Sequence, residues 1–258
     1  MFFPVRSQAK WVVFCIFCMG FVLPSFADVS YTPLSGDVKS SSFTVPKITL
    51  SGHIQQDDLK QFITLTNLAK QESTLYQVEL NSLGGDVETA LSMGRILRLD
   101  KGKASVAVQR EGMCFSSCVL VLAGSASRFV VGSVGIHRPY APIDNSMTAD
   151  LQKQYYERIE IEVKAYLQEM NIPTELYDHM FRIPPEKVKF LTDDELQKYG
   201  LSEDDPYEDA AKNARLAKDI GITAQELLQR KAKYKSECST LNSADSGRCY
   251  DRIVIEGR

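Results

Sequence analysis

Segments with strand character alternate with segments of helical periodicity over residues 45–137, and this alternation constrains the fold more than any other feature. Apolar, β-branched runs mark strands, and apolar residues three or four positions apart mark helices. Strands are predicted at residues 45–54, 75–80, 104–108, 128–131 and 134–137, and helices at 56–70, 86–99 and 116–123. Parallel neighbours need a crossover connection, which is usually a helix. The pattern therefore predicts an α/β domain with a mainly parallel sheet.

A different pattern follows residue 139. Residues 148–170 carry apolar side chains at helical spacing along one side, which predicts a long amphipathic helix without a partner nearby in the sequence. From residue 203 the chain is highly charged. Shorter helices are predicted at residues 174–181, 193–199, 206–220 and 223–235.

The N-terminus has the composition of a secretory signal peptide. Arg6 and Lys10 precede an apolar run over residues 11–23, and a segment with small residues ends at Ala27. The run is too short to cross a hydrocarbon core about 30 Å thick at about 1.5 Å per residue. We therefore predict cleavage after Ala27, export to a periplasmic location, and a mature chain that starts at Asp28 without a transmembrane segment.

The predicted organisation has four parts. Residues 1–27 form the signal peptide, and the Ser-, Thr- and Pro-containing residues 28–46 form a flexible arm. Residues 47–202 form the α/β domain. Residues 203–258 form a charged helical extension that ends in a disulfide loop.

The charge balance argues against nucleic acid as a partner. The formal net charge is −3, and loss of the two basic residues of the signal peptide makes it −5. Phosphate binding needs a clustered basic face, and the lysines and arginines here are scattered. No nucleic-acid partner is expected.

The cysteines of the mature chain fall into two local pairs. They are Cys114 with Cys118 and Cys238 with Cys249. An even number of cysteines in an exported chain suggests disulfides. Cys114, Cys118 and His137 could instead be metal ligands, but three ligands without a fourth make a poor zinc site. Two disulfides and no metal are predicted.

Residues 81–85 read Asn-Ser-Leu-Gly-Gly between a predicted strand and a predicted helix. Gly84 and Gly85 would let backbone amides turn toward a ligand and approach it closely, as an oxyanion or phosphate site requires. The alternative is a tight turn with no further role.

Residues 112–118 read Gly-Met-Cys-Phe-Ser-Ser-Cys and open an apolar helix. A serine in the first turn of a buried helix could be a nucleophile, because the helix dipole favours negative charge beside it. The alternative is that Ser116 or Ser117 only caps the helix, as such serines usually do.

His137, in the segment Ile-His-Arg-Pro, ends a predicted strand. A neutral imidazole at that position could accept the proton of a serine hydroxyl. His53 and His179 are predicted to be ordinary polar residues.

These three segments resemble, in their order and placement, the Clp peptidase family and its relatives, the signal peptide peptidases of the crotonase-like fold. In that family a strand ends in Asn-Ser-Pro-Gly-Gly, a nucleophilic serine begins a buried helix, and the base lies in Ile-His-Gln-Pro. The resemblance covers about residues 48–201, where Phe-Leu-Thr at 190–192 and Tyr-Gly-Leu at 199–201 look like further family segments. It implies stacked ββα units around the sheet, with the helix from residue 148 as the protruding handle helix.

A group of predicted periplasmic proteins of this fold is more similar still, because its nucleophile motif is Cys-Ala-Ser-Ala-Cys. The family serine lies midway between the cysteines, which selects Ser116. The resemblance implies that the amide of Ser117, with that of Gly84 or Gly85, forms an oxyanion hole. It also implies that His137 is the base, and a local disulfide would brace the nucleophile turn.

The sequence departs from the family pattern at several points. Leu83 replaces a proline, Phe115 replaces a small residue, and the interval from Ser116 to His137 is shorter. The expected aspartate before residue 190 is absent, and Glu186 is the nearest acid. Glu186 either orients His137 as the third member of a triad or is a solvated surface charge, in which case a Ser-His dyad remains.

We therefore predict an exported serine hydrolase, a peptidase that acts by acyl transfer on a peptide or protein substrate without a cofactor. The handle helix of the resembled family mediates subunit contacts, so a homo-oligomer is expected. Two alternatives stay open: a non-catalytic scaffold that binds peptides or proteins, and a thioester hydrolase on the same fold. The pair Ser116 and His137 favours an enzyme, whereas the absence of the expected aspartate and the bulk of Phe115 favour a binding protein.

Overall fold

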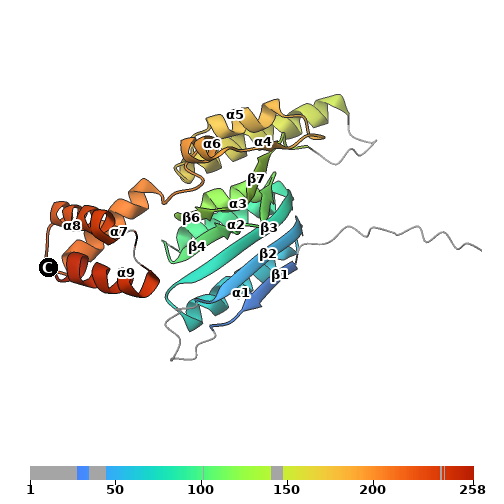
Figure 1. Cartoon of the computed structure of the whole chain (residues 1–258). Helices are drawn as coiled ribbons and strands as arrows, with labels where there is room; N and C mark the ends of the chain where they lie inside the picture. Colours follow the sequence, from blue (N-terminus) through green and yellow to red (C-terminus); the bar gives the residue numbers. More distant parts are fainter. Residues whose placement is uncertain (1–27, 35–44, 101, 141–147, 239, 241) are drawn as a thin grey trace, which may run out of the picture.

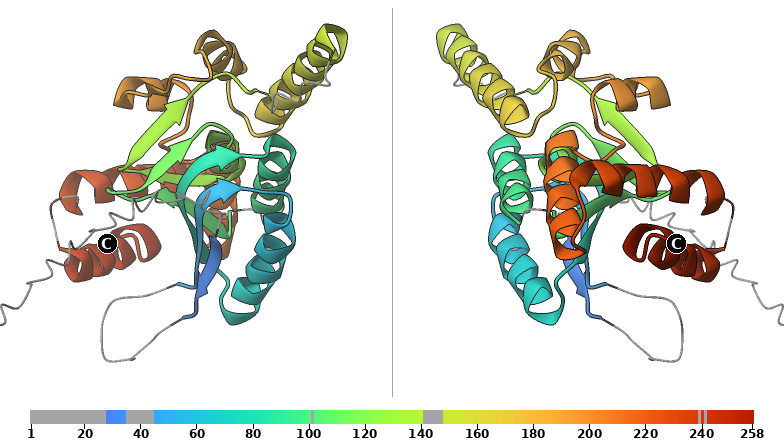
Figure 2. Two further views of the ribbon diagram at one scale, coloured as in Figure 1. Left: turned by 90° about the vertical axis from the view of Figure 1, so that its right-hand side faces the viewer. Right: turned by 90° about the vertical axis from the view of Figure 1, so that its left-hand side faces the viewer.

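The computed structural model describes residues 28–34, 45–100, 102–140, 148–238, 240 and 242–258. These residues form an α/β domain with a mainly parallel sheet, a layer of helices at one end of it, and a helical C-terminal extension (Figures 1 and 2). The predicted fold class is confirmed. The predicted signal peptide, residues 1–27, lies outside the described residues.

The strands of the sheet are, in chain order, β1 Asp28–Thr32, β2 Lys47–Ile54, β3 Tyr76–Gly85, β4 Ala104–Val108, β5 Met113–Phe115, β6 Ser127–Val130, β7 Ser133–Ile136 and β8 Lys189–Phe190. The helices are α1 Asp58–Glu72, α2 Val87–Leu99, α3 Cys118–Gly124, α4 Ala149–Glu169, α5 Glu175–Arg182, α6 Asp193–Lys198, α7 Pro206–Asp219, α8 Ala224–Cys238 and α9 Ser243–Tyr250, followed by a π-helical turn, η1 Asp251–Ile255.

The strand order explains how distant motifs come together. The sheet runs β1-β2-β3-β5-β7-β8, and β4 and β6 branch from β3. The pairs from β2 to β7 are parallel, while the outer strands β1 and β8 are antiparallel. The long strand β3 pairs first with β4 and then, at Ser82, with Cys114 of β5. The carboxyl ends of β2, β3, β5 and β7 therefore meet at one edge.

The helix α3 lies at the centre of the core. All of its residues are buried, as its uniformly apolar sequence requires. It packs against α2, where a side-chain atom on Gly124 would collide with the backbone of Gly94. Glycine at both positions therefore lets the two helices approach closely.

The long helix α4 packs on helices that are distant from it in the sequence, although no partner was evident in the neighbouring sequence. Ile159, Val163 and Tyr166 are buried, and the Tyr166 hydroxyl donates a hydrogen bond to the Leu120 carbonyl at 2.6 Å, over Gly94 of α2. Its apolar face thus packs on the α2 and α3 layer. None of the described helices has the length and apolar character needed to span a membrane.

The first residues after the predicted cleavage site are not a flexible arm. Residues 28–32 form β1, in which Val29 is fully buried and its carbonyl accepts a hydrogen bond from the Gln61 side chain at 2.6 Å. Val29 and Tyr31 alternate with polar residues, which is the pattern of a half-buried edge strand. Residues 35–44 of the predicted arm lie outside the described residues.

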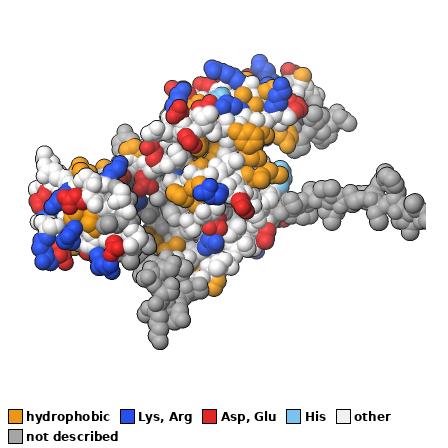
Figure 3. Space-filling view, in the orientation of Figure 1, with side chains coloured by type: hydrophobic (Ala, Val, Ile, Leu, Met, Phe, Trp, Pro, Cys, Tyr) orange, Lys and Arg blue, Asp and Glu red, His pale blue; other side chains and the backbone are white. Residues whose placement is uncertain are grey.

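The C-terminal extension has a small core of its own. It is formed by Ala217, Leu227, Cys238, Cys249, Ile253 and Val254. Cys238 and Cys249 form a disulfide that joins α8 to α9. The extension is linked to the main domain at the buried Asp205, whose carboxylate accepts from Arg98 and Asn171, each at 3.0 Å. Acidic and basic side chains are interspersed on the face shown in Figure 3.

We predict that the disulfide stabilises this extension and not the main domain. Replacing both Cys238 and Cys249 by alanine should lower the free energy of unfolding of the extension by about 2–3 kcal/mol, because the loop between them is no longer closed in the unfolded chain. Hydrogen exchange should then be faster in α8 and α9 and unchanged in α2 and α3. Equal loss of protection in both parts would contradict this.

Candidate active site

A cavity of about 510 Å³ lies at the carboxyl edge of the parallel strands. Ligands of open α/β sheets bind at this edge. Residues that directly follow or end β2, β3, β5 and β7 line it, together with one residue of α4. They are His53, Ile54, Gln55, Gln56, Asp57, Leu83, Gly85, Asp86, Val87, Ser116, His137, Pro139, Tyr140 and Tyr155. The predicted nucleophile and the predicted base thus share one cavity.

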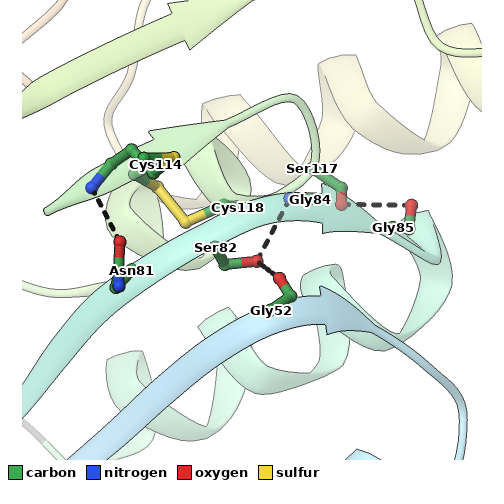
Figure 4. The surroundings of a disulfide bond; sticks show 9 residues. Gly52, Asn81, Ser82, Gly84, Gly85, Cys114, Ser117 and Cys118 are labelled. Atoms are coloured by element: carbon green, nitrogen blue, oxygen red, sulfur yellow. Dashed lines mark hydrogen bonds between the residues drawn. A yellow bond between two sulfur atoms is a disulfide. The ribbon is translucent and has the colours of Figure 1, made fainter. Parts of the chain in front are cut away.

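Ser116 occupies a constrained turn between β5 and α3. Its φ angle is 55°, in the left-handed region that residues other than glycine rarely adopt. Its N–H donates to the Gly135 carbonyl at 2.9 Å. A disulfide between the buried Cys114 and Cys118 closes the turn around it (Figure 4). Such conformations persist only where the surroundings enforce them, and they cluster at functional sites.

The two adjacent serines have different surroundings. Ser117 is buried, and its hydroxyl donates to the Gly85 carbonyl at 3.1 Å (Figure 4). Ser116 is half-buried and lines the cavity. The Ser117 side chain makes no capping bond to α3, and the Ser116 side chain makes none of the hydrogen bonds found among the described residues. Ser116 is therefore the serine that a ligand in the cavity can reach.

The Gly-Gly turn packs against the serine turn. Gly84 has φ 93°, and a Cβ atom built on it would lie 2.7 Å from the Ser116 Cβ and 3.0 Å from the Ser117 nitrogen. The Gly84 N–H donates to the Ser82 hydroxyl at 3.1 Å, which itself donates to the Gly52 carbonyl at 2.7 Å (Figure 4). Gly84 is thus required for close approach, while Gly85 is the glycine that lines the cavity.

We predict that Gly84→Ala disrupts the site. The added methyl group must displace the Ser116 turn, and displacement of a reacting group by about 1 Å can cost about 100-fold in rate. The readout is the rate of labelling by a fluorophosphonate, a reagent that reacts with activated serines. Gly221→Ala is the matched control, because Gly221 also has a positive φ, 73°, but nothing lies within 4 Å of its added Cβ. Equal labelling rates in the two variants would contradict the prediction.

The geometry of His137 defines its tautomer. Only 7% of the residue is exposed, and Nδ1 lies 3.0 Å from the Arg138 carbonyl oxygen. A carbonyl can only accept, so Nδ1 carries the proton and Nε2 has a lone pair when the ring is neutral. The Arg138 backbone is fixed in turn, since its N–H donates to the Ile183 carbonyl at 2.8 Å. No hydrogen bond joins Ser116 to His137 among the described residues.

Glu186 does not orient His137 in this structure. Its side chain is exposed, and it takes part in none of the hydrogen bonds or ion pairs found among the described residues. The Arg138 carbonyl occupies the partner position at Nδ1 instead. The reason is local: Glu186 follows Pro185 in a surface turn in which the Lys187 N–H donates back to the Pro184 carbonyl at 3.0 Å.

The bulk of Phe115 does not obstruct the cavity. Its ring packs edge-on against Phe190 of β8, with 5.4 Å between ring centroids, and beside Gly135 of β7. It is absent from the cavity lining. The side chain that seemed to argue against catalysis therefore lies on the other side of the turn.

Several cavity residues escaped the sequence motifs. His53 was expected to be an ordinary polar residue, yet it lines the cavity, as do Asp57, Tyr140 and Tyr155. The position of His53 in the sequence could have indicated this, because His53 lies at the carboxyl end of a strand, β2, that pairs with β3 at Gly84. His179, by contrast, contacts the Tyr199 hydroxyl at 3.0 Å, away from the cavity.

The cysteines near the nucleophile are not metal ligands here. Cys114 and Cys118 are bonded to each other. Within the described part of the chain, no group of three or more histidine, cysteine, aspartate or glutamate side chains is arranged to hold a metal ion.

A serine that begins a buried helix, beside a Gly-Gly turn and a histidine at a neighbouring strand end, defines a class of α/β protein with the fold of a serine peptidase. The sequence model that describes the Clp protease family matches residues 34–204 of this chain. The chain belongs to the Clp protease family.

Solved structures of similar fold include ClpP1 from Listeria monocytogenes, with 17% sequence identity and a TM-score of 0.48, covering 60% of this chain and 88% of that one. A mutant of the same protein has 17% sequence identity and a TM-score of 0.49, and the match covers 60% of this chain and 88% of that one. A mutant of the 1510-N membrane-bound stomatin-specific protease has 18% sequence identity and a TM-score of 0.47, and the match covers 64% of this chain and 82% of that one. No curated protein matches the chain. Likenesses this distant do not indicate a shared substrate.

Proposed function

We propose that the protein is an exported serine hydrolase that cleaves peptide bonds by acyl transfer. One observation carries the proposal: Ser116, held in a left-handed turn, and His137, with Nε2 available, line the same cavity. Membership of the Clp protease family supports a peptide or protein substrate. No cofactor is needed for this chemistry.

In the proposed reaction, the Ser116 hydroxyl oxygen attacks the carbonyl carbon of the substrate, and its proton passes to Nε2 of His137. The carbonyl oxygen becomes an oxyanion. When the tetrahedral intermediate collapses, the bond to the amine breaks and His137 returns the proton to the amine. Water then hydrolyses the acyl-enzyme by the same route and regenerates Ser116.

The oxyanion is proposed to bind the N–H of Ser117 and the N–H of Gly85. Ser117 directly follows the nucleophile, and the hydrogen bonds of the described residues include none donated by its N–H. Gly85 is preferred to Gly84 for two reasons: it lines the cavity, and the Gly84 N–H is already donated to Ser82. Two fixed amide donors are the usual form of an oxyanion hole.

The proposed catalytic unit is a dyad in which the Arg138 carbonyl orients His137. The main-chain carbonyl fixes the tautomer as a carboxylate would, although it adds no negative charge to stabilise the imidazolium. Such a site should be a slower hydrolase than one with a complete triad. The exposed position of Glu186 supports this version over the triad.

Assembly and location are also proposals. A homo-oligomer is supported by Leu151 and Ile161, two apolar residues of α4 that are 52% and 69% exposed. Light scattering at micromolar concentration measures it. Export to the periplasm is supported by the apolar N-terminal sequence and by the two disulfides, which persist in oxidising compartments. N-terminal analysis of exported protein should begin at Asp28.

Fluorophosphonate labelling of the oxidised wild-type protein tests the function. We expect one adduct per chain, located by peptide mapping on the peptide that contains Ser116. A protein that is never labelled under any condition, while remaining folded, would favour the non-catalytic scaffold. That alternative is supported by the absence of a Ser116 to His137 hydrogen bond among the described residues.

A further inference from the structure

The cavity carries negative charge that its walls do not offset. Asp57 and Asp86 both line it, and the described lining residues include no lysine or arginine. Aspartate is negatively charged at neutral pH, whereas His53 and His137 add no charge when neutral. A substrate that enters the cavity therefore meets two carboxylates and no lysine or arginine among the lining residues.

Neither carboxylate is neutralised by a basic side chain of the described residues. Asp86 caps α2 by accepting the Thr89 N–H at 2.8 Å through Oδ1, and Oδ2 remains available to a ligand. Asp57 precedes α1, is exposed and makes no capping bond. The ion pairs of the described residues include neither of them. Both negative charges are available to attract a cation.

Two aromatic walls suit a cation as well. Tyr140 and Tyr155 line the cavity, and the face of a tyrosine ring attracts a cation within about 6 Å. Burial raises the pKa of the Tyr155 phenol. Arg158 opposes this effect, and the charges of Asp86 and Glu88 add to it. Arg158 is not a lining residue, but its guanidinium lies 5.7 Å from the centroid of the Tyr155 ring and is paired with Glu88 at 2.7 Å, which leaves Tyr140 as the ring without a cation from the described residues.

His137 offers a ligand in the cavity an atom that can accept a hydrogen bond. Its side chain is nine-tenths buried and lines the cavity, yet Nε2 makes no hydrogen bond among the described residues. The fully buried side-chain atoms without a partner among the described residues are the Tyr31 hydroxyl and the Arg128 Nε, so Nε2 of His137 is open to the cavity. The volume of about 510 Å³ also lies in the range of about 300–1,000 Å³ typical of ligand pockets.

We infer that the cavity selects peptides with a lysine or arginine side chain next to the bond attacked by Ser116. The inference rests on the proposed function and adds its substrate class. Asp57 and Asp86 bind the cation, and Tyr140 and Tyr155 cover its aliphatic stem. An apolar side chain would remove water from the carboxylates without compensation, and an acidic one would be repelled.

The test uses three peptidyl diphenyl phosphonates that differ only in the side chain next to phosphorus: lysine, norleucine and glutamate. Ser116 Oγ forms a bond to phosphorus, phenoxide leaves, and the serine proton passes to His137. Norleucine keeps the length of lysine without its charge. We expect the wild-type protein to react about tenfold or more faster with the lysine probe than with norleucine, which corresponds to one well-placed charge contact, and slowest with glutamate.

The ratio of lysine to norleucine rates within each variant is the decisive quantity. Asp57→Asn and Asp86→Asn should each lower it, and the double variant should bring it close to one; asparagine keeps the capping ability of Asp86. Asp57→Lys should raise the rate with the glutamate probe relative to norleucine. Glu111→Gln, which removes an exposed charge that is not part of the cavity lining, should keep the wild-type ratio.

Two failures can be told apart. If a fluorophosphonate without a peptide does not label the wild-type protein, the proposed function fails and this inference falls with it. If that reagent labels Ser116 but the lysine to norleucine ratio is one or below, or is the same in the double variant as in the wild-type protein, only the inference on substrate class is overturned.

Discussion

The Ser116→Ala variant is expected to show no covalent labelling by a fluorophosphonate while it remains folded. The hydroxyl is the proposed attacking group, so its removal leaves no oxygen to bond to phosphorus. The fold should tolerate the change, because the Ser116 side chain lies at the cavity and makes none of the hydrogen bonds found among the described residues. Mass spectrometry of the intact protein measures the adduct, and thermal unfolding measures the fold.

Ser117→Ala is the matched control for that experiment. It removes a neighbouring hydroxyl whose bond to the Gly85 carbonyl contributes about 1 kcal/mol, and it keeps the amide proposed for the oxyanion hole. Labelling should therefore continue, at a rate reduced by no more than several-fold. Labelling that survives in Ser116→Ala and disappears in Ser117→Ala would show that the wrong serine has been assigned.

The second large effect is expected for His137→Ala. Without a base, the serine hydroxyl is an unactivated alcohol, and general-base catalysis contributes about 10²- to 10⁴-fold. The labelling rate should fall by that factor, with the adduct still on Ser116. The measurement is the second-order rate constant of labelling at neutral pH.

His179→Ala separates loss of the base from loss of any histidine. His179 contacts the Tyr199 hydroxyl at 3.0 Å and does not line the cavity, so its variant should be labelled at the wild-type rate. If both histidine variants are labelled as fast as the wild-type protein, Ser116 is not activated by His137.

The sequence was most informative where one pattern governs many residues. The alternation over residues 45–137 predicted the parallel sheet, and β4 was predicted at its observed bounds. The short strands β5 and β8 were missed, because segments of two or three residues are too brief to show a period of two. They form through pairing with β3 and β7, which are distant in sequence.

In the site, too, the local motifs could be predicted from the sequence and the contacts between distant segments could not. The motifs around Gly84, Ser116 and His137 were visible because each ends or follows a predicted strand. The oxyanion turn could not be resolved further, because the Gly84 N–H is donated to the Ser82 hydroxyl, which is itself oriented by the Gly52 carbonyl of the paired strand β2. Glu186 was proposed from sequence distance alone, and the partner of His137 is instead a backbone carbonyl, which leaves no trace in residue identity.

The placement of Tyr155 on α4 has a consequence for the newly made chain. The walls of the cavity are drawn from residues 53 to 155, and α4 supplies the last of them after β2, β3, β5 and β7. Domains generally fold as units as the chain emerges. A growing chain therefore displays its serine turn in a finished cavity only after the helix that carries Tyr155 has docked on α2, so under the proposed function an incomplete chain would lack a complete site.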